Sequence, residues 1–254
     1  MTALKGKAPN LMNSDIDEKV VNHVAKAIYN EALKAARAEL SNIDFSSAEL
    51  PNLFSKLIHE SETGQVLIFA SYLEDRINFL THLRMKHLSS KREEEEVFGT
   101  NGPLSTLSNK VALAYQMDWI SGETRTNLNR FRKIRNHFAH EAFNIGYSTE
   151  KVASHFSKIL AHFSAAIASA ANVLIEARII ESFVEVEKLP LREKNLCSMA
   201  LLAGRLFEEF LILPIALKHH VSPTDLSYEA ENPLSNVKEI GESAARALIC
   251  VLQM

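Results

Sequence analysis

Glycine and proline, the residues that most often interrupt helices, are rare in this sequence and lie between long uninterrupted stretches. Residues 148–188 contain neither, and the same is true of residues 14–39. As one helix, residues 148–188 would extend for about 60 Å. No segment alternates polar and apolar residues for long enough to predict a strand. The sequence therefore predicts an all-α fold, an antiparallel helical bundle that includes one long helix.

Apolar residues that recur three and four positions apart indicate where the helices lie. Residues 1–13 contain Gly6, Pro9 and small polar side chains, so we expect a flexible tail. The charge run at 91–96 is expected to be a solvated connector. Pro214 is expected to kink or end a helix. The predicted helices span residues 14–39, 48–60, 65–88, 105–119, 121–140, 148–188, 191–220 and 235–254. Ser121 is the expected N-cap of the helix at 121–140.

Pro190 marks a boundary between a helical bundle at residues 14–188 and a C-terminal helical segment at residues 189–254. One shift of the sequence against itself aligns several residues of the two parts: Ala70 with Ala200, Ile77 with Phe207, Leu80 with Phe210, and Pro103-Leu104-Ser105 with Pro233-Leu234-Ser235. The C-terminal segment is therefore either a degenerate, partial repeat of the first helices or an amphipathic stretch that aligns with them by chance.

Composition excludes several classes of protein. The chain of 254 residues has a formal net charge of -3 and a sequence pI near 6.4, so any nucleic-acid site must be local. Cys197 and Cys250 lie among apolar residues and are expected to be core thiols. No apolar run approaches the roughly 20 residues that span a bilayer, and residues 1–13 lack a hydrophobic signal region. We therefore expect a cytoplasmic protein without membrane association.

The residues most able to carry chemistry lie together at 130–141. Arg135 and Asn136 are adjacent, and His140 completes an Arg-Asn-x-x-x-His pattern. Residues 124–140 contain no acidic residue but five basic ones: Arg125, Arg130, Arg132, Lys133 and Arg135. This local charge fits an RNA or phosphate site, although a solvated helix face balanced by the acidic run at 93–96 would show the same pattern.

These motifs resemble two related families. The helix at Ala70-Ser71-Tyr72-Leu73-Glu74, the turn at 98–104, the helix at Leu107-Ser108-Asn109-Lys110 and the block at 132–140 resemble the mannitol operon repressor (MltR) family. The block at 132–140 taken alone resembles the wider HEPN superfamily of helical bundles, many of which cut or bind RNA. The resemblance covers about residues 60–180 and implies an HEPN-like helical bundle.

HEPN ribonucleases, as this resemblance implies, cleave RNA without a metal: the 2′-hydroxyl attacks the adjacent phosphate and leaves a cyclic phosphate end. Histidine can shuttle a proton near neutral pH, and arginine offers a permanently charged fork to phosphate oxygens. We therefore assign acid/base work to His140, phosphate binding to Arg135 and positioning to Asn136. Further substrate contacts are expected from nearby residues: Arg130, Arg132, Lys133 and His137.

The spacing of the motif sets a geometric condition. Residues five apart lie about 140° apart around a helix, whereas Asn136 and His140, four apart, share a face. Arg135 instead falls on an apolar stripe with Phe131 and Phe138, so either the helix ends near Phe138 or Arg135 points into a seam. A seam between two subunits would satisfy both alternatives. Related domains commonly pair so that two motifs meet in one cleft, so the resemblance implies a homodimer. A buried arginine needs a carboxylate, and the candidates are Glu74 and Asp75.

Three functions remain open on the sequence alone. The first is a metal-independent ribonuclease, a toxin or defence effector, with RNA as substrate and an antitoxin as a conceivable partner. The second is an MltR-like regulator that represses transcription through protein partners such as a transcription factor. In the third, the motif only holds the bundle together. The chain shows no phosphate loop, dinucleotide fingerprint or zinc-type cysteine pair, and His137, His140 and Glu141 lack a further metal partner, so no cofactor or metal is expected.

Overall fold

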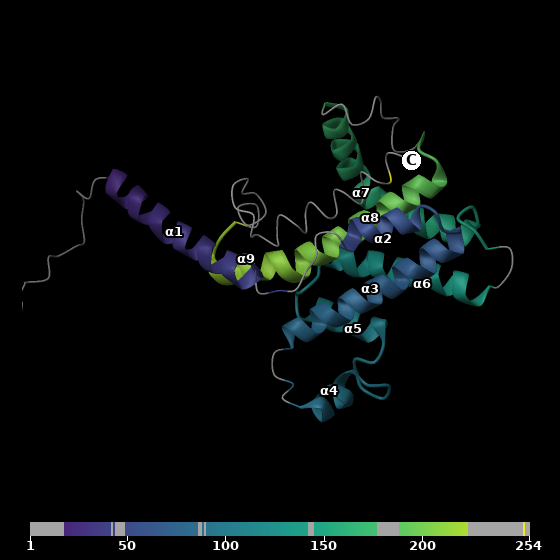
Figure 1. Ribbon diagram of the computed structural model, residues 1–254, viewed down its shortest axis with the longest axis horizontal. Coiled ribbons are helices and arrows are strands. Elements are labelled where there is room, and N and C mark those ends of the chain that lie inside the picture. Colours follow the sequence, from purple (N-terminus) through teal and green to yellow (C-terminus); the bar gives the residue numbers. More distant parts are fainter. Residues whose placement is uncertain are drawn as a thin grey trace, which may run out of the picture.

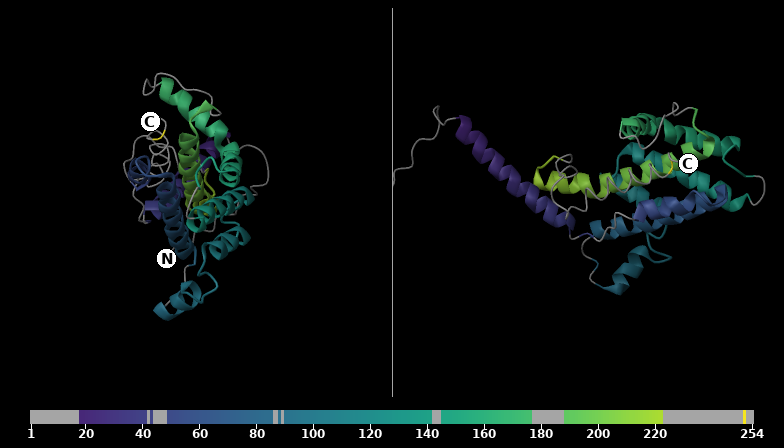
Figure 2. Two further views of the ribbon diagram at one scale, coloured as in Figure 1. Left: turned by 90° about the vertical axis from the view of Figure 1, so that its right-hand side faces the viewer. Right: turned by 45° about the horizontal axis from the view of Figure 1, so that its top comes forward.

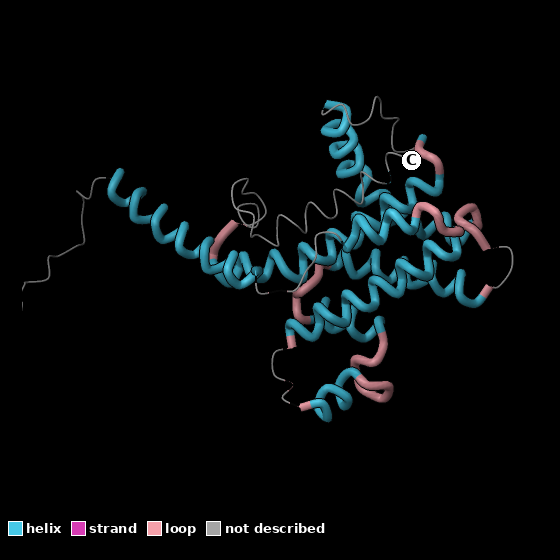
Figure 3. Tube along the Cα trace, in the orientation of Figure 1, coloured by secondary structure: helices cyan, strands magenta, loops and turns pink. Residues whose placement is uncertain are grey.

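The computed structural model describes residues 18–41, 43, 49–85, 88, 90–141, 145–176, 188–222 and 251. Within these residues the chain forms helices and no strand, which confirms the predicted all-α bundle (Figures 1 and 3). The elements are α1 (Glu18–Ser41), α2 (Glu49–Leu57), α3 (Glu62–Arg84), α4 (Lys91–Phe98), α5 (Leu107–Gln116), α6 (Gly122–His140), α7 (Glu150–Glu176), α8 (Leu191–Phe207), the π-helical turn η2 (Glu208–Ile212) and α9 (Leu213–His219).

One prediction about local structure needs correction. The charge run at 91–96 belongs to a helix, α4, and not to a connector. Its residues are solvated as expected, but the Ser90 side chain accepts a hydrogen bond from the Glu93 N–H, and Arg92 pairs with Glu96 one turn later at 2.9 Å. A helix cap and a pair four residues apart together stabilise a short exposed helix.

The helical segment at 191–220 passes through Pro214 without ending there. The Leu213 N–H donates to the Glu208 carbonyl, five residues back, and this π-type bond closes the wider turn η2. Pro214 then lies in the first turn of α9, and because it has no N–H it leaves one carbonyl of the preceding turn without an intrahelical donor. The tail at 1–13 and the helix predicted at 235–254 lie outside the described residues, apart from the helical Val251.

Helix α6 occupies the middle of the bundle. It packs against α3, α5, α7 and α8, and α3 also contacts α2, α5 and α8. Helix α1 extends away from this body and contacts α9, as the views in Figures 1 and 2 show. In the described part of the chain, no helix is both long and apolar enough to cross a bilayer. The shift similarity stays a prediction: Ala200, Phe207 and Phe210 lie in α8 and η2, whereas the aligned residues at 233–235 lie outside the described residues.

A chain of aromatic rings fixes α6 between its neighbours. Phe69 of α3 packs edge-to-face on Phe54 of α2 and Phe131 of α6, with ring centroids 5.9 and 5.1 Å apart. Phe131 also contacts Phe156 of α7, with ring centroids 6.3 Å apart. Phe156 in turn contacts Tyr147, with ring centroids 5.3 Å apart. Such pairs add stability beyond the area they bury. The apolar side of α6 is therefore held on two sides, which leaves its polar side toward solvent.

A buried polar pair joins the start of α3 to the segment before α7. The Tyr147 hydroxyl donates to Gln65 Oε1 at 2.7 Å, and Gln65 Nε2 donates to the Leu57 carbonyl at 2.7 Å. Both side chains are buried, and burial raises the pKa of the Tyr147 phenol above its usual value. Each polar group of Gln65 thus has a partner in the core, as buried amides require.

Replacing Tyr147 with phenylalanine is expected to lower the free energy of unfolding by about 1–3 kcal/mol, because Gln65 Oε1 would remain buried without a donor. Tyr72→Phe is the matched control. The Tyr72 hydroxyl is buried without a hydrogen-bond partner among the described residues, so its removal should cost about 0 kcal/mol or stabilise the fold. Urea denaturation followed by circular dichroism compares the two variants, and equal losses would contradict this account.

The first turn of α6 is fixed from the C-terminal part of the chain. The Ser121 N–H donates to Glu209 Oε2 at 2.8 Å, while the Ser121 hydroxyl accepts from the Thr124 N–H at 3.1 Å. Glu209 is buried and its other carboxylate oxygen pairs with Arg205 at 2.9 Å. The sequence predicted Ser121 as the N-cap of this helix, which is confirmed. The role of Glu209 depends on η2, which turns it toward α6.

Candidate site on helix α6

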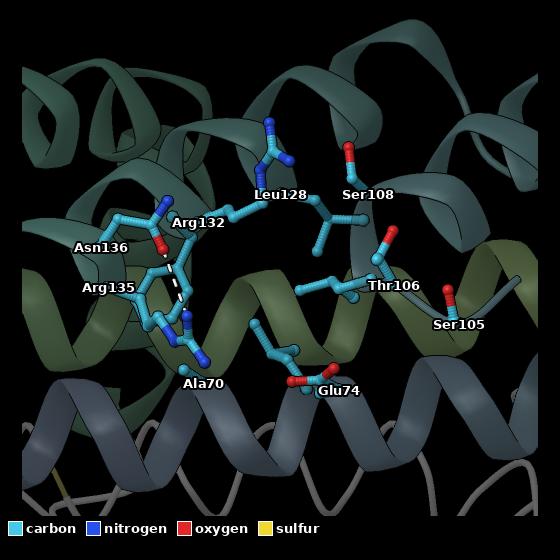
Figure 4. A pocket seen from close by; sticks show the side chains of 12 residues that line it. Ala70, Glu74, Ser105, Thr106, Ser108, Leu128, Arg132, Arg135 and Asn136 are labelled. Atoms are coloured by element: carbon cyan, nitrogen blue, oxygen red, sulfur yellow. Dashed lines mark hydrogen bonds between the residues drawn. The ribbon is translucent and has the colours of Figure 1, made fainter. Parts of the chain in front are cut away.

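A cleft of about 310 Å³ lies between α3, α5 and α6. Its floor is apolar and its walls are polar. Figure 4 shows Arg132, Arg135 and Asn136 on the α6 side, hydroxyl groups on the facing side, and Glu74 rising from α3. The residues that line the cleft are Ala70, Leu73, Glu74, Ser105, Thr106, Leu107, Ser108, Leu128, Phe131, Arg132, Arg135 and Asn136.

Arg135 and Asn136 form one unit at the mouth of this cleft. Arg135 Nη1 donates to Asn136 Oδ1 at 3.2 Å, and both residues are exposed. Helix α6 continues to His140, two residues beyond Phe138, and Arg135 is exposed, so it does not point into a seam between helices of one chain; a seam between two subunits stays a prediction. Arg135 lies only about 40° from Phe131 around the axis, but its long side chain reaches from the edge of the apolar stripe to water.

His140 is the last residue of α6 and is exposed. It lies one turn beyond Asn136 on the same face, but it is not among the residues that line the cleft. His137 points about 100° away from Asn136, and its Nδ1 hydrogen-bonds to Glu141 Oε1 at 2.8 Å. The structure thus brings Arg132, Arg135 and Asn136 together in one cleft, whereas His140 lies on the same helix outside the lining of the cleft.

The two carboxylates predicted to support Arg135 lie in different surroundings. Glu74 lines the cleft with Arg135, whereas Asp75 is exposed and faces a separate hollow between α3 and α4, which Glu74 also borders. Since Arg135 is exposed and already bonded to Asn136, it has no need of a buried carboxylate. Within the described residues, no group of three or more histidine, cysteine or acidic side chains is suited to hold a metal ion.

Arg130 and Lys133 line a second cleft, of about 460 Å³, between α5, α6 and α7. Arg130 Nη1 donates to Asn127 Oδ1 at 2.9 Å and reaches the Lys158 carbonyl at 3.4 Å. His155 and Lys158 also line this cleft, although neither was predicted as a site residue. Their positions in the sequence do not indicate that they belong to a site, because only the packing of α7 on α6 brings them to this cleft.

Cys197 of α8 is a core thiol, as expected, and burial raises its pKa to about 12. Cys250 lies outside the described residues. The chain matches no family model, and comparisons with characterised proteins and with solved structures found no similar one. The described residues thus define an all-helical protein whose central helix presents basic residues to two clefts.

Proposed function

We propose that this protein is a metal-independent RNA endonuclease of the HEPN type that acts through Arg135, Asn136 and His140. The observation that carries the proposal is that all three residues are exposed along one helix and that two of them line a cleft. A motif that merely held the bundle together would be buried and bonded to other helices. Here, the hydrogen bond of Arg135 is to its neighbour Asn136.

The charge on α6 supports RNA as the ligand. Between Thr124 and His140 the helix has no carboxylate, and its basic side chains divide between the cleft of Arg135 and the cleft of Arg130. Phosphate contacts from arginine and lysine supply most of the affinity for nucleic acid without reading its sequence. The net charge of the whole chain is -3, so binding would be confined to this face.

The proposed reaction assigns one role to each group. The 2′-hydroxyl oxygen attacks the adjacent phosphorus, the bond from phosphorus to the 5′-oxygen breaks, and a 2′,3′-cyclic phosphate remains. Arg135 binds the phosphate oxygens, where negative charge increases in the transition state, and Asn136 holds the Arg135 guanidinium in place. His140 transfers a proton. In a homodimer that pairs the two α6 helices, the second copy would supply a second imidazole, so that one accepts and one donates a proton.

The experiment that tests the proposal is incubation of the purified protein with single-stranded and hairpin RNA in excess chelator. Products with cyclic phosphate ends are expected. If RNA is bound but never cut, the protein is better described as the regulator that acts through partners, and its oligomeric state and bound proteins become the measurements of interest.

Glu74 provides a test of the cleft itself. It is the carboxylate among the residues that line the cleft, so Glu74→Gln should tighten RNA binding by about 2–5-fold, the effect of removing one repulsive charge near the surface. Asp75→Asn is the matched control, since it removes the same charge from the next residue, outside the cleft, and should change affinity less. Fluorescence anisotropy with labelled RNA gives both values. Weaker binding by Glu74→Gln would instead mean that Glu74 positions Arg135.

A further inference from the structure

The cleft between α5, α6 and α7 concentrates positive charge that no carboxylate in its lining neutralises. Its lining residues are Tyr115, Gly122, Arg125, Thr126, Asn129, Arg130, Lys133, His155 and Lys158. Glu123, in the first turn of α6, instead pairs with His162 of α7. The basic groups come from two helices, so their convergence is a product of the fold and not of one charged run.

Several of these basic groups are held in place. Arg130 Nη1 is bonded to Asn127 Oδ1 at 2.9 Å and lies 3.3 Å from His162 Nε2. The Arg125 guanidinium stacks on the Tyr115 ring, 4.5 Å from its centroid, a contact that orients a cation while leaving its N–H groups available. Asn129 adds an amide to the same wall, whereas the Thr126 hydroxyl already donates to the Gly122 carbonyl at 2.7 Å. A site preorganised in this way loses less conformational entropy when a ligand binds.

His155 reports the electrostatic potential inside the cleft. Its Nδ1 is buried without a hydrogen-bond partner among the described residues. The pKa of His155 lies below its usual value, first because of burial and then because of four basic groups around it: Lys133, His137, Lys158 and Arg130. Protonating this imidazole is unfavourable as long as those charges have no counter-ion, so an anion in the cleft would raise its pKa.

We propose that this cleft is a phosphate-binding site, separate from the cleft of Arg135. Phosphate fits better than a carboxylate because it can carry two negative charges and offers several oxygens to donors that converge from different directions. The group could belong to an RNA backbone that crosses α6 or to a free nucleotide, and both present the same chemistry. The site does not depend on RNA being cut, since it uses none of Arg135, Asn136 and His140.

The test follows the imidazole signal of His155 by NMR while the full chain is titrated with inorganic phosphate at several pH values. Phosphate is expected to raise the pKa of His155. Lys158→Glu should weaken the apparent affinity about 10-fold, because it reverses one charge in the cleft. Lys151→Glu is the matched control: it reverses an equally exposed charge on α7, outside the lining, and should change affinity by less than about 2-fold.

Two further ligands identify the source of the phosphate. If RNA without terminal phosphates shifts His155 at lower concentration than adenosine monophosphate does, the site takes a backbone phosphate; the reverse order identifies a free nucleotide. An unchanged pKa of His155 with all three ligands, or equal losses in the two lysine variants, would overturn the proposal. A chain that binds phosphate here but cuts no RNA would reject only the ribonuclease function.

Discussion

Replacing His140 with alanine is expected to lower the rate of RNA cleavage by about 10²–10⁴-fold, the usual contribution of a positioned acid or base. His140 ends α6, is exposed, and shares a face with Asn136. Its side chain can therefore be removed without opening a cavity in the core. RNA affinity should change little, because the phosphate contacts are assigned to the arginine and lysine side chains. Single-turnover cleavage in chelator, together with anisotropy, measures the two quantities separately.

His59→Ala is the matched control for this prediction. His59 is also exposed, but it follows α2 and lines neither cleft on α6. Cleavage by this variant should equal that of the wild type. Equal cleavage by His140→Ala and the wild type, with both proteins folded, would remove His140 from the mechanism. A loss of binding together with cleavage in His140→Ala would point to a ground-state contact and not to proton transfer.

Replacing Phe69 with alanine is expected to lower the free energy of unfolding by about 3–5 kcal/mol, within the range found for large aromatic residues truncated in cores. Phe69 is fully buried and contacts the rings of Phe54 and Phe131, so its removal empties the point where α2, α3 and α6 meet. This is a large share of the 5–15 kcal/mol that stabilises a typical domain. Chemical denaturation by urea measures the loss.

Ile68→Ala controls for the loss of a large apolar side chain at the neighbouring position. Ile68 is 40% exposed, so its truncation should cost no more than about 1 kcal/mol. The ratio of the two losses is the informative quantity, because both substitutions lie on α3 and alter helix propensity in the same direction. Comparable losses of stability would mean that Phe69 is not the main residue through which α3 packs into the core.

Much of the fold was predictable because helices follow from local patterns. The apolar spacing of α3 and α6 and the N-cap at Ser121 were readable directly from the sequence. The error at 91–96 arose because a run of charged residues is typical of a connector but can also form a capped helix. The charge run of α4 looked like a connector, although Ser90 caps it as a helix. Pro214 was expected to kink or end a helix, and the α-helical hydrogen bonding does change just before it, at the π-helical turn η2.

The site was predictable only along one helix. The sequence groups Arg135, Asn136 and His140 and indicates that the last two share a face. It could not show that Arg135 reaches solvent. The position lies at the edge of the apolar stripe, and only the length of the arginine side chain brings the guanidinium to water. Nor could it show that Lys158 faces Lys133 across a cleft, because that depends on how α7 docks on α6.

The hydrogen bond between the Ser121 N–H and the Glu209 carboxylate joins positions 88 residues apart in the chain. At a synthesis rate of about 5–20 residues per second, the ribosome needs about 4–18 s to make the intervening chain. During that interval a nascent chain already contains Arg135, Asn136 and His140, but not the carboxylate that fixes the first turn of their helix. The Ser121 N–H therefore gains its carboxylate acceptor only late in translation, well after the motif residues have been synthesised.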